Sequence, residues 1–303
     1  MKLGITFICL AIALAACKPA EQPVPENIVD SGFHIIGKLE SARLDEASGM
    51  QAGAGGVFFL HNDEGDDLFA IDARGSHLGR MHVKKAKNKD WEDITRVPGE
   101  NGPLLVIGDI GDKHRTRKKL KLYFLEEPAA ADLQGEVTPV HETTLRLPGK
   151  ATDLEAMAYD PSSGTILFIS KPDQPPRLFG IALDQALAEK ELTLQFLGEV
   201  HGLRPPSQKD VLMGFKRGLR VSQPTGMDIS ADGRLAAVIT YRSLYLWQRE
   251  EGESWIEAFQ RQPVEYLGPP GLYEEAVSFS EDEKSIYVTS ERRPAPLSRL
   301  DLF

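Results

Sequence analysis

The chain of 303 residues has only two cysteines, Cys9 and Cys17, and both lie near its N-terminus. The rest of the sequence therefore has no thiol that could form a disulfide, attack a substrate or bind zinc. It also has no Gly-x-Ser-x-Gly nucleophile elbow and no glycine-rich phosphate loop. These absences argue against covalent catalysis and leave the hydrophobic core to stabilise the folded part.

Basic side chains are fewer than acidic ones, 35 against 45, which gives a formal net charge of −10. An acidic protein of this kind is not expected to bind nucleic acid, although a local basic patch can still exist. Two basic runs, residues 84–89 and 114–119, lie in adjacent repeats. We expect both to be solvated loops, with anionic polymers or lipid head groups as the alternative partners.

The N-terminal apolar run, residues 3–13, follows Lys2 and is too short to span a bilayer, which takes about 20 residues. It ends in Leu14-Ala15-Ala16-Cys17, which resembles the lipobox of bacterial lipoproteins. The resemblance implies cleavage after Ala16 and attachment of lipid to Cys17. An ordinary secretory signal with a chance cysteine is the alternative.

These features divide the chain into three parts. We predict a signal peptide over residues 1–16, a lipidated Cys17 with a flexible Pro-rich tether over residues 17–30, and one folded domain over residues 31–303. The protein would then be held in the cell envelope by its lipid. Lys18, rather than aspartate, after the cysteine indicates the outer membrane if the host is Gram-negative.

Five segments of the folded part share one pattern: a strand that opens with Glu or Thr, a tight turn, and a second apolar strand. The distance from the opening residue to the end of the second strand is constant in four segments and longer by one residue in 92–108. The opening residues are Glu46, Glu92, Glu155, Thr225 and Glu275. A spacing kept through five segments indicates a repeat architecture.

Short strands separated by turns, with helical character only over residues 184–192, indicate an all-β fold. We predict a β-propeller of five blades with four strands each. The last repeat reaches Phe303 before a fourth strand, so the strand over residues 33–39 is expected to pair with it and close the ring. A sixth, eroded blade over residues 199–224 is the alternative, but only residues 211–215 could form a strand there, and we expect a long loop.

The first strand of each propeller blade lines the central channel, so the five opening residues should meet at one mouth. Four carboxylates in a narrow channel repel one another unless some are protonated or a cation lies between them. Oxygen ligands without sulfur or imidazole favour a hard cation, and Ca2+ accepts irregular geometry better than Mg2+ does. Glutamates that cap loops or pair with nearby Lys and Arg are the alternative.

Loops between second and third strands should open on the same mouth. Their charged residues could bind phosphate or carboxylate beside the metal, with an aspartate or a histidine as the base for water. Turn formation alone also explains Asp and Asn at such positions. The candidates for catalysis are His61, Asp63, Asp109, Asp112, Lys171, Arg242 and Arg292.

The order of motifs resembles that of the five-bladed Ca2+-dependent apyrases, through residues 91–92, 154–156, 224–226 and 273–276. The resemblance implies a central Ca2+ held by side chains of successive blades, and it concerns fold and metal more than reaction. Other strings are similar to an uncharacterised group of bacterial secreted propeller proteins and carry no activity with them. These strings are residues 48–50, 61–66, 90–94 and 107–112.

Two functions follow from these patterns. The first is a monomeric ligand-binding or scaffold propeller in which Ca2+ fixes the blades, with a small anionic ligand or another envelope protein as partner. The alternative is a Ca2+-dependent hydrolase of a small phosphate-type substrate. We favour the first, because the sequence does not provide a complete catalytic set.

Overall fold

The computed structural model describes residues 27–29, 32–268, 274–291 and 293–302, and within this part it leaves the side chains of residues 213–217 undescribed. The predicted signal peptide, Cys17 and most of the tether lie outside the described residues. Among those described, no helix is long and apolar enough to cross a membrane.

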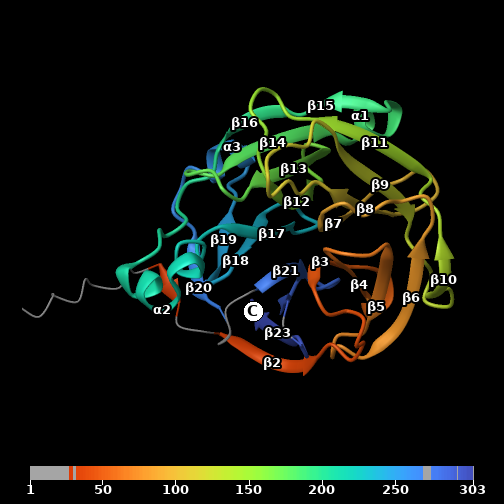
Figure 1. Ribbon diagram of the computed structural model, residues 1–303, viewed down its shortest axis with the longest axis horizontal. Coiled ribbons are helices and arrows are strands. Elements are labelled where there is room, and N and C mark those ends of the chain that lie inside the picture. The colour runs from red at the N-terminus through yellow and green to blue at the C-terminus, as the bar shows by residue number, and fades with distance from the viewer. Residues whose placement is uncertain (1–26, 30–31, 269–273, 292, 303) are drawn as a thin grey trace, which may run out of the picture.

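Five small sheets stand around a central axis (Figure 1), which confirms the five-bladed propeller and excludes the six-bladed alternative. Each blade is given from its inner strand outward. Blade one is β3 (Ala47–Ala52), β4 (Phe58–Asn62), β5 (Asp67–Ile71) and β6 (His77–Val83). Blade two is β7 (Trp91–Val97), β8 (Leu104–Asp109), β9 (Leu120–Glu126) and β11 (His141–Arg146). Blade three is β12 (Leu154–Asp160), β13 (Thr165–Ser170), β14 (Arg177–Ala182) and β16 (Gln195–Glu199). Blade four is β17 (Pro224–Ile229), β18 (Leu235–Thr240), β19 (Ser243–Gln248) and β20 (Val264–Leu267).

Blade five is shared by the two ends of the chain. Its inner strands are β21 (Glu274–Phe279), β22 (Ser285–Ser290) and β23 (Pro296–Asp301), and its outermost strand is β2 (Phe33–Lys38). β2 pairs antiparallel with β23, with Phe33 opposite Leu300. This pairing confirms the predicted closure of the ring.

Three blades carry an additional outer strand that runs parallel to its neighbour. β10 (Gln134–Val137) lies on β6, β15 (Glu191–Thr193) on β11, and β1 (Ile28–Val29) on β20. β1 falls at the end of the segment predicted as a tether, and the side chain of Asn27 donates a hydrogen bond to the Pro263 carbonyl at 2.9 Å. The described part of the chain therefore begins at the outer edge of blade four.

The core consists of five apolar clusters, one between each pair of adjacent blades. Middle strands such as β8 and β13 are buried almost throughout, which explains their continuous apolar sequences. Large rings fill the clusters, for example Phe168 and Phe179 between blades two and three. Removing such a ring would cost about 3–5 kcal/mol.

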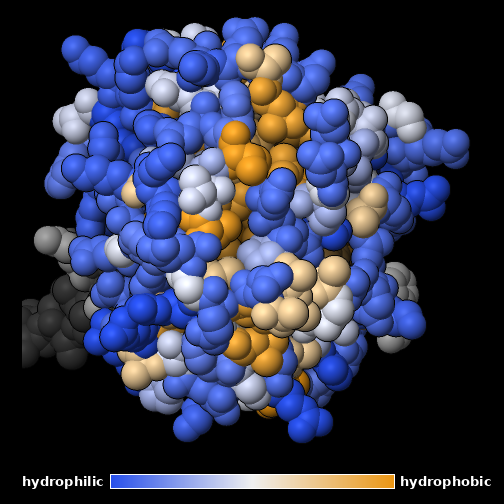
Figure 2. Space-filling view, turned by 90° about the vertical axis from the view of Figure 1, so that its right-hand side faces the viewer, coloured by the Kyte–Doolittle hydropathy of each residue, from blue (hydrophilic) through white to orange (hydrophobic). Residues whose placement is uncertain are grey.

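Few large apolar side chains are exposed. Figure 2 shows a mostly hydrophilic face with a broken hydrophobic band running down it. The described side chains of this kind are Val29, Ile35, Leu78, Val140, Phe196, Leu212, Leu219, Ile256 and Val264.

Side chains on the inner strands tie the blades together around the axis. The carboxylate of Asp93, on β7, is completely buried and accepts hydrogen bonds from the backbone N–H groups of Met157 at 2.8 Å and Met227 at 3.0 Å. Asp228 of blade four likewise accepts one from the Phe279 N–H of blade five at 2.9 Å. These bonds join blade two to blades three and four, and blade four to blade five.

The segment between β16 and β17 differs from the prediction. In place of a loop with a possible strand at residues 211–215 it contains the helix α2 (Gln208–Gly218). Ser207 and Asp210 explain where α2 begins: the Asp210 side chain accepts the Ser207 N–H at 2.7 Å, and Ser207 Oγ accepts the Asp210 N–H at 3.2 Å. This reciprocal capping is a local signal that the strand-based interpretation missed.

The smaller helices are partly as predicted. α1 (Leu183–Ala188) lies in the expected helical segment, which then turns into β15. The short helices η1 (Ala54–Gly56) and α3 (Trp255–Ala258) were not predicted. α3 begins at Ser254, which forms a capping box with Glu257, so the last strand of blade four starts only at Val264.

Candidate functional site

A ring of five buried residues marks one mouth of the channel, each the second residue of an inner strand. At this residue the pairing register shifts in every blade, which is the mark of a β-bulge. Bulges often redirect a side chain next to a functional site. The five residues are Ser48, Glu92, Glu155, Thr225 and Glu275.

Glu46, predicted for this ring, lies two residues too early, and Ser48 takes the position. The side chain of Glu46 is 44% exposed and lies 4.0 Å from Arg293. The prediction applied the spacing of the other repeats to blade one, but the β3–β4 hairpin is one residue shorter than those of blades three, four and five. In addition, β4 ends at Asn62 rather than at residue 61. A better signal was present in the sequence, since Ser48-Gly-Met matches Glu155-Ala-Met and Thr225-Gly-Met.

A lysine from the chain itself neutralises part of this ring. Lys171 follows β13, and its Nζ lies 2.7 Å from Glu155 Oε2 and 5.0 Å from the centre of the Tyr241 ring. Burial alone would lower the pKa of Lys171, but the charges of Glu155 and Glu275 outweigh it and hold the pKa above its ordinary value. For Glu155, therefore, pairing with a nearby lysine is observed.

The ring glutamates resist ionisation. Burial raises the pKa of Glu155 to about 7, with the Lys171 charge opposing this rise. Burial and then the Glu155 charge raise the pKa of Glu92, and burial raises that of Glu275 although the Tyr241 hydroxyl donates a hydrogen bond to it. At neutral pH the mouth therefore favours either protons or a bound cation.

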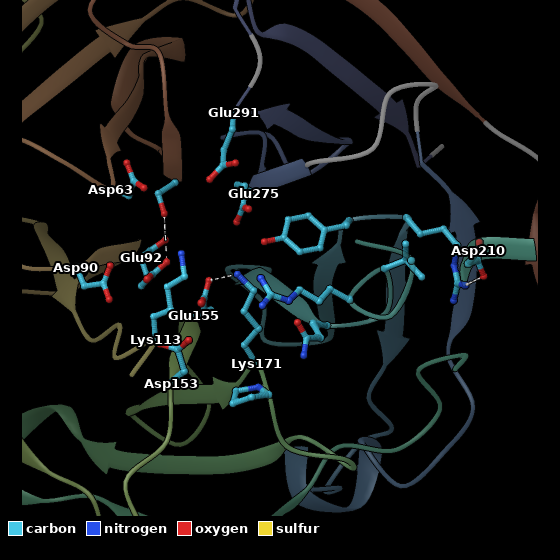
Figure 3. Close-up of a pocket in the computed structure, with 18 of the residues that line it drawn as sticks. Asp63, Asp90, Glu92, Lys113, Asp153, Glu155, Lys171, Asp210, Glu275 and Glu291 are labelled. Carbon is cyan, nitrogen blue, oxygen red and sulfur yellow. Dashed lines mark hydrogen bonds and ion pairs between the residues drawn. The ribbon is translucent and has the colours of Figure 1, made fainter. Parts of the chain in front are cut away.

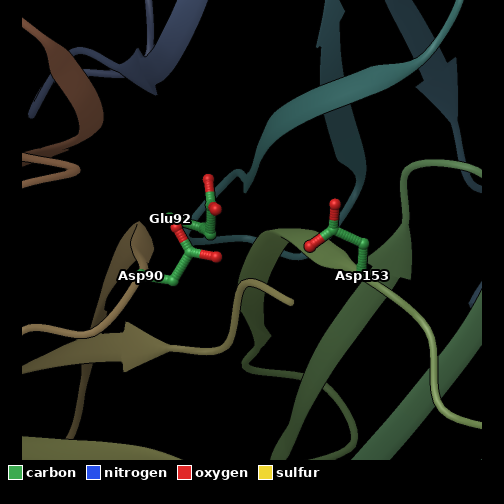
Figure 4. Close-up of side chains that lie close together, drawn as sticks. All are labelled: Asp90, Glu92 and Asp153. Carbon is green, nitrogen blue, oxygen red and sulfur yellow. The ribbon is translucent and has the colours of Figure 1, made fainter. Parts of the chain in front are cut away.

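The carboxylate of Glu92, a ring residue, meets two further carboxylates between blades two and three (Figure 4). One oxygen each of Asp90, Glu92 and Asp153 lies within 4.8 Å of the others. Sequence reasoning did not select Asp90 or Asp153. The signal that could have found them is the repeated Asp-x-Glu that opens both blades, Asp90-Trp-Glu92 and Asp153-Leu-Glu155.

Gly111 makes room for this carboxylate cluster. Its N–H donates to the Asp90 carbonyl at 3.1 Å, and the Lys171 N–H donates to the Asp153 carbonyl at 3.1 Å, so the two residues are equivalent in their blades. A Cβ on Gly111 would lie 2.2 Å from Glu92 Oε1 and 2.6 Å from Asp90 Oδ2. Blade two thus leaves open the space that a side chain fills in blade three.

His61 is not at the mouth, contrary to its prediction as a base. It is completely buried in β4, where its ring packs edge to face on Trp91 at 5.6 Å. Its Nδ1 lies 3.1 Å from the Asn62 carbonyl oxygen. Burial lowers the pKa of His61 to about 4, so the imidazole is neutral and serves as a wall residue.

Asp109 and Asp112 support the site from behind. Asp109 pairs with Arg117 at 2.8 Å and accepts the Asp90 N–H at 3.2 Å, which fixes the strand that carries Glu92. Asp112 accepts the Thr116 N–H and donates its own N–H to Asp153. Both side chains are buried, and neither lines the cavity over the ring. Arg292 lies outside the described residues.

Asp63, Lys171 and Arg242 do line one cavity of about 1070 Å³ over the ring. Figure 3 shows carboxylates, including Asp63, Asp90 and Glu291, gathered on one side and Asp210 on the other. Burial and the neighbouring Glu46 charge raise the pKa of Asp63 to about 6. The cationic residues of the cavity, Lys171 apart, are Lys113, Arg115, Arg204, Lys209, Arg220 and Arg242.

Neither a scan of protein families nor a search of curated proteins finds a match to the sequence. Among solved structures, the chain is similar to a gluconolactonase of Xanthomonas campestris, with 12% identity over 85% of this chain and 87% of that one, and a TM-score of 0.42. It is also similar to a chain of a nidogen/laminin complex, with 10% identity over 80% of this chain and 72% of that one, and a TM-score of 0.45. A further structure, of a protein assigned as a gluconolactonase, has 11% identity over 87% of this chain and 77% of that one, and a TM-score of 0.48. Similarities of this size carry no statement about activity, and the resemblance to apyrases stays an expectation.

Proposed function

We propose that the protein is an exported propeller, anchored by lipid on Cys17, that binds a small ligand in the cavity over the ring together with Ca2+ at Asp90, Glu92 and Asp153. The lipobox-like sequence supports the anchor, and the cavity supports the binding role. A binding module, rather than an enzyme, is the simpler function, because His61 is completely buried in β4. His61 is the only histidine among the predicted bases.

The carboxylate cluster between blades two and three is the observation that carries the proposal. None of its three members forms a salt bridge with another described residue, whereas Glu155 next to them has Lys171. Ser48 Oγ, 3.4 Å from Glu92 Oε2, adds a hydroxyl oxygen to the set. Oxygen donors in an irregular arrangement fit Ca2+, which takes 6–8 such ligands and can complete them with backbone carbonyls and water.

The proposed ligand set keeps one of the five predicted metal ligands, Glu92. Thr225 uses its hydroxyl to donate to the Glu274 carbonyl at 2.8 Å, and Glu155 and Glu275 surround Lys171. Glu46 lies outside the ring. The ion site is therefore proposed beside the axis.

Burial and the charge of Asp153 raise the pKa of Asp90, and burial raises that of Glu92. A bound cation favours the ionised carboxylates, so its binding must release protons and weaken as the pH falls.

Calorimetric titration of the purified protein with Ca2+ and Mg2+ tests the proposal. We expect Ca2+ to bind more tightly and to raise the melting temperature, with about 2.7 kcal/mol of stabilisation at a hundredfold excess over Kd. Absence of Ca2+ binding at pH 7.5, where the carboxylates can ionise, would reject it.

Asp63 keeps a hydrolase as the second candidate. Its Oδ1 is buried at the cavity and has no hydrogen-bond partner among the described residues. With its pKa raised to about 6 it could accept a proton from water near neutral pH. Release of phosphate from phosphate esters that requires both Ca2+ and Asp63 would establish this activity over the binding role.

A further inference from the structure

The segment between blades three and four, residues 201–223, includes α2 (Figure 1). Residues near both ends of the segment and in the first turn of α2 line the cavity. It carries five basic residues and one acidic residue in a chain where acidic residues predominate. The basic residues are Arg204, Lys209, Lys216, Arg217 and Arg220. A basic segment over a carboxylate-rich mouth points to recognition of a second chemical group.

Arg242, on blade four, fixes this segment in place. Its Nη2 donates to the Arg204 carbonyl at 2.6 Å and to Ser222 Oγ at 3.0 Å, and its Nη1 donates to Asp210 Oδ2 at 2.8 Å. One guanidinium, only 9% exposed, thus holds both ends of the segment and the first turn of α2. The wall of the cavity is therefore organised before any ligand arrives.

The side chain of Arg204 also holds this segment in place. Its side chain donates to both carboxylate oxygens of Glu265, at 2.8 Å and 2.6 Å. The Glu265 carboxylate is nearly fully buried and accepts a further hydrogen bond from Ser243 at 2.6 Å. These contacts attach the segment to the outer strand of blade four.

Lys209 and Arg220 are different, because they line the cavity and form no ion pair with any residue in the described part of the chain. Lys113 and Arg115, from the basic loop of blade two, have the same property. Four cations that form no ion pair with a described residue thus share a cavity with the carboxylate cluster. Such groups bind oxyanions through charge-assisted hydrogen bonds.

We propose that residues 201–223 select the ligand by binding an oxyanion of the phosphate type through Lys209 and Arg220, while the carboxylate cluster holds the metal-coordinated end. The ligand is then a small molecule with a phosphate-like group at one end and metal-binding oxygens at the other. The location rests on the proposed function, but the oxyanion site needs no metal. Lys113 and Arg115 line the same cavity and, like Lys209 and Arg220, are exposed, so they would contribute further contacts.

Inorganic phosphate is the probe, titrated into the full protein with and without Ca2+. The double variant Lys209→Ala with Arg220→Ala should weaken phosphate binding by at least roughly tenfold and leave Ca2+ binding unchanged. Lys190→Ala with Arg74→Ala is the matched control, since it removes the same charges from exposed residues outside the cavity and should change neither affinity.

The outcomes separate the two proposals. Equal phosphate affinity in the wild type and the Lys209/Arg220 variant would overturn the oxyanion site even if Ca2+ binds. Phosphate binding that depends on these residues, without any Ca2+ binding, would support the oxyanion site and reject the metal. Binding to phosphatidylglycerol vesicles without binding of free phosphate would overturn the small-ligand assignment.

Discussion

Lys171 Nζ lies 2.7 Å from Glu155 Oε2, and the two side chains are only 14% and 7% exposed. An ammonium of the chain thus occupies the part of the mouth where repulsion between Glu155 and Glu275 would be greatest. The candidate ion site lies to one side of this pair, where Gly111 provides no side chain.

Lys171→Met should destabilise the protein by about 3 kcal/mol at pH 8, because it leaves the buried Glu155 carboxylate without its partner. Urea unfolding measures this change. The double variant Lys171→Met with Glu155→Gln should recover most of the loss, since no unpaired charge remains. Equal stability of the wild type and the single variant at pH 8 would show that the Lys171–Glu155 ion pair does not contribute to stability.

The stability of the metal-free protein should fall as the pH rises from 4.5 to about 7. Burial raises the pKa of Glu155 from its ordinary 4.5 to about 7, so the folded state binds this proton more tightly than the unfolded chain does. The resulting stabilisation is complete below pH 4.5 and is lost as the pH passes 7. Urea unfolding in the presence of a chelator, repeated at several pH values, measures the slope of the unfolding free energy against pH. Glu155→Gln should reduce this slope by up to about 1.4 kcal/mol per pH unit. Parallel curves for both proteins would contradict the assignment.

Gly111→Ala should abolish the rise in melting temperature that Ca2+ produces. The new methyl group would lie 2.2 Å from Glu92 Oε1 and so would fill the space between the carboxylates without removing any of them. Asp90→Asn, which removes a charge but adds no bulk, should have the same effect. Melting curves in chelator provide the control for folding, and a full Ca2+ response in both variants would place the ion elsewhere.

Deleting residues 32–40 should lower the melting temperature sharply, whereas deleting residues 18–26 should not. The first deletion removes β2 and with it the strand that closes blade five against β23. Phe33 would also leave the cluster between blades four and five. Circular dichroism melts of the two truncations provide the comparison, and equal melting temperatures would refute the role of β2 in closure.

Cys17→Ser should release the protein from membranes, because a single acceptor thiol would carry the whole anchor. Fractionation of cells that express the wild type or the variant measures this. Labelled fatty acid incorporated equally into both proteins would disprove lipidation at Cys17.

Most of the fold could be predicted from the sequence because the information is local and repeated. Turn residues, apolar runs and the five openings each specify a hairpin within about 15 residues, and the strand at Phe33 has no other partner in the pattern. The prediction failed where one blade departed from the others. The shorter hairpin of blade one moved the ring position from Glu46 to Ser48, and a capped helix replaced the expected loop at α2.

The sequence by itself determined the all-β repeat, the number of blades, the closure by the N-terminal strand and the concentration of carboxylates at one mouth. Only the tertiary structure decided how those carboxylates are compensated. It brought Asp90 and Asp153 of different blades to Glu92, placed Lys171 against Glu155, and buried His61. The physical reason is that strand and turn preferences act over a few neighbouring residues. The pairing of charges near the axis depends instead on bulges, hairpin lengths and side-chain directions that five blades set together.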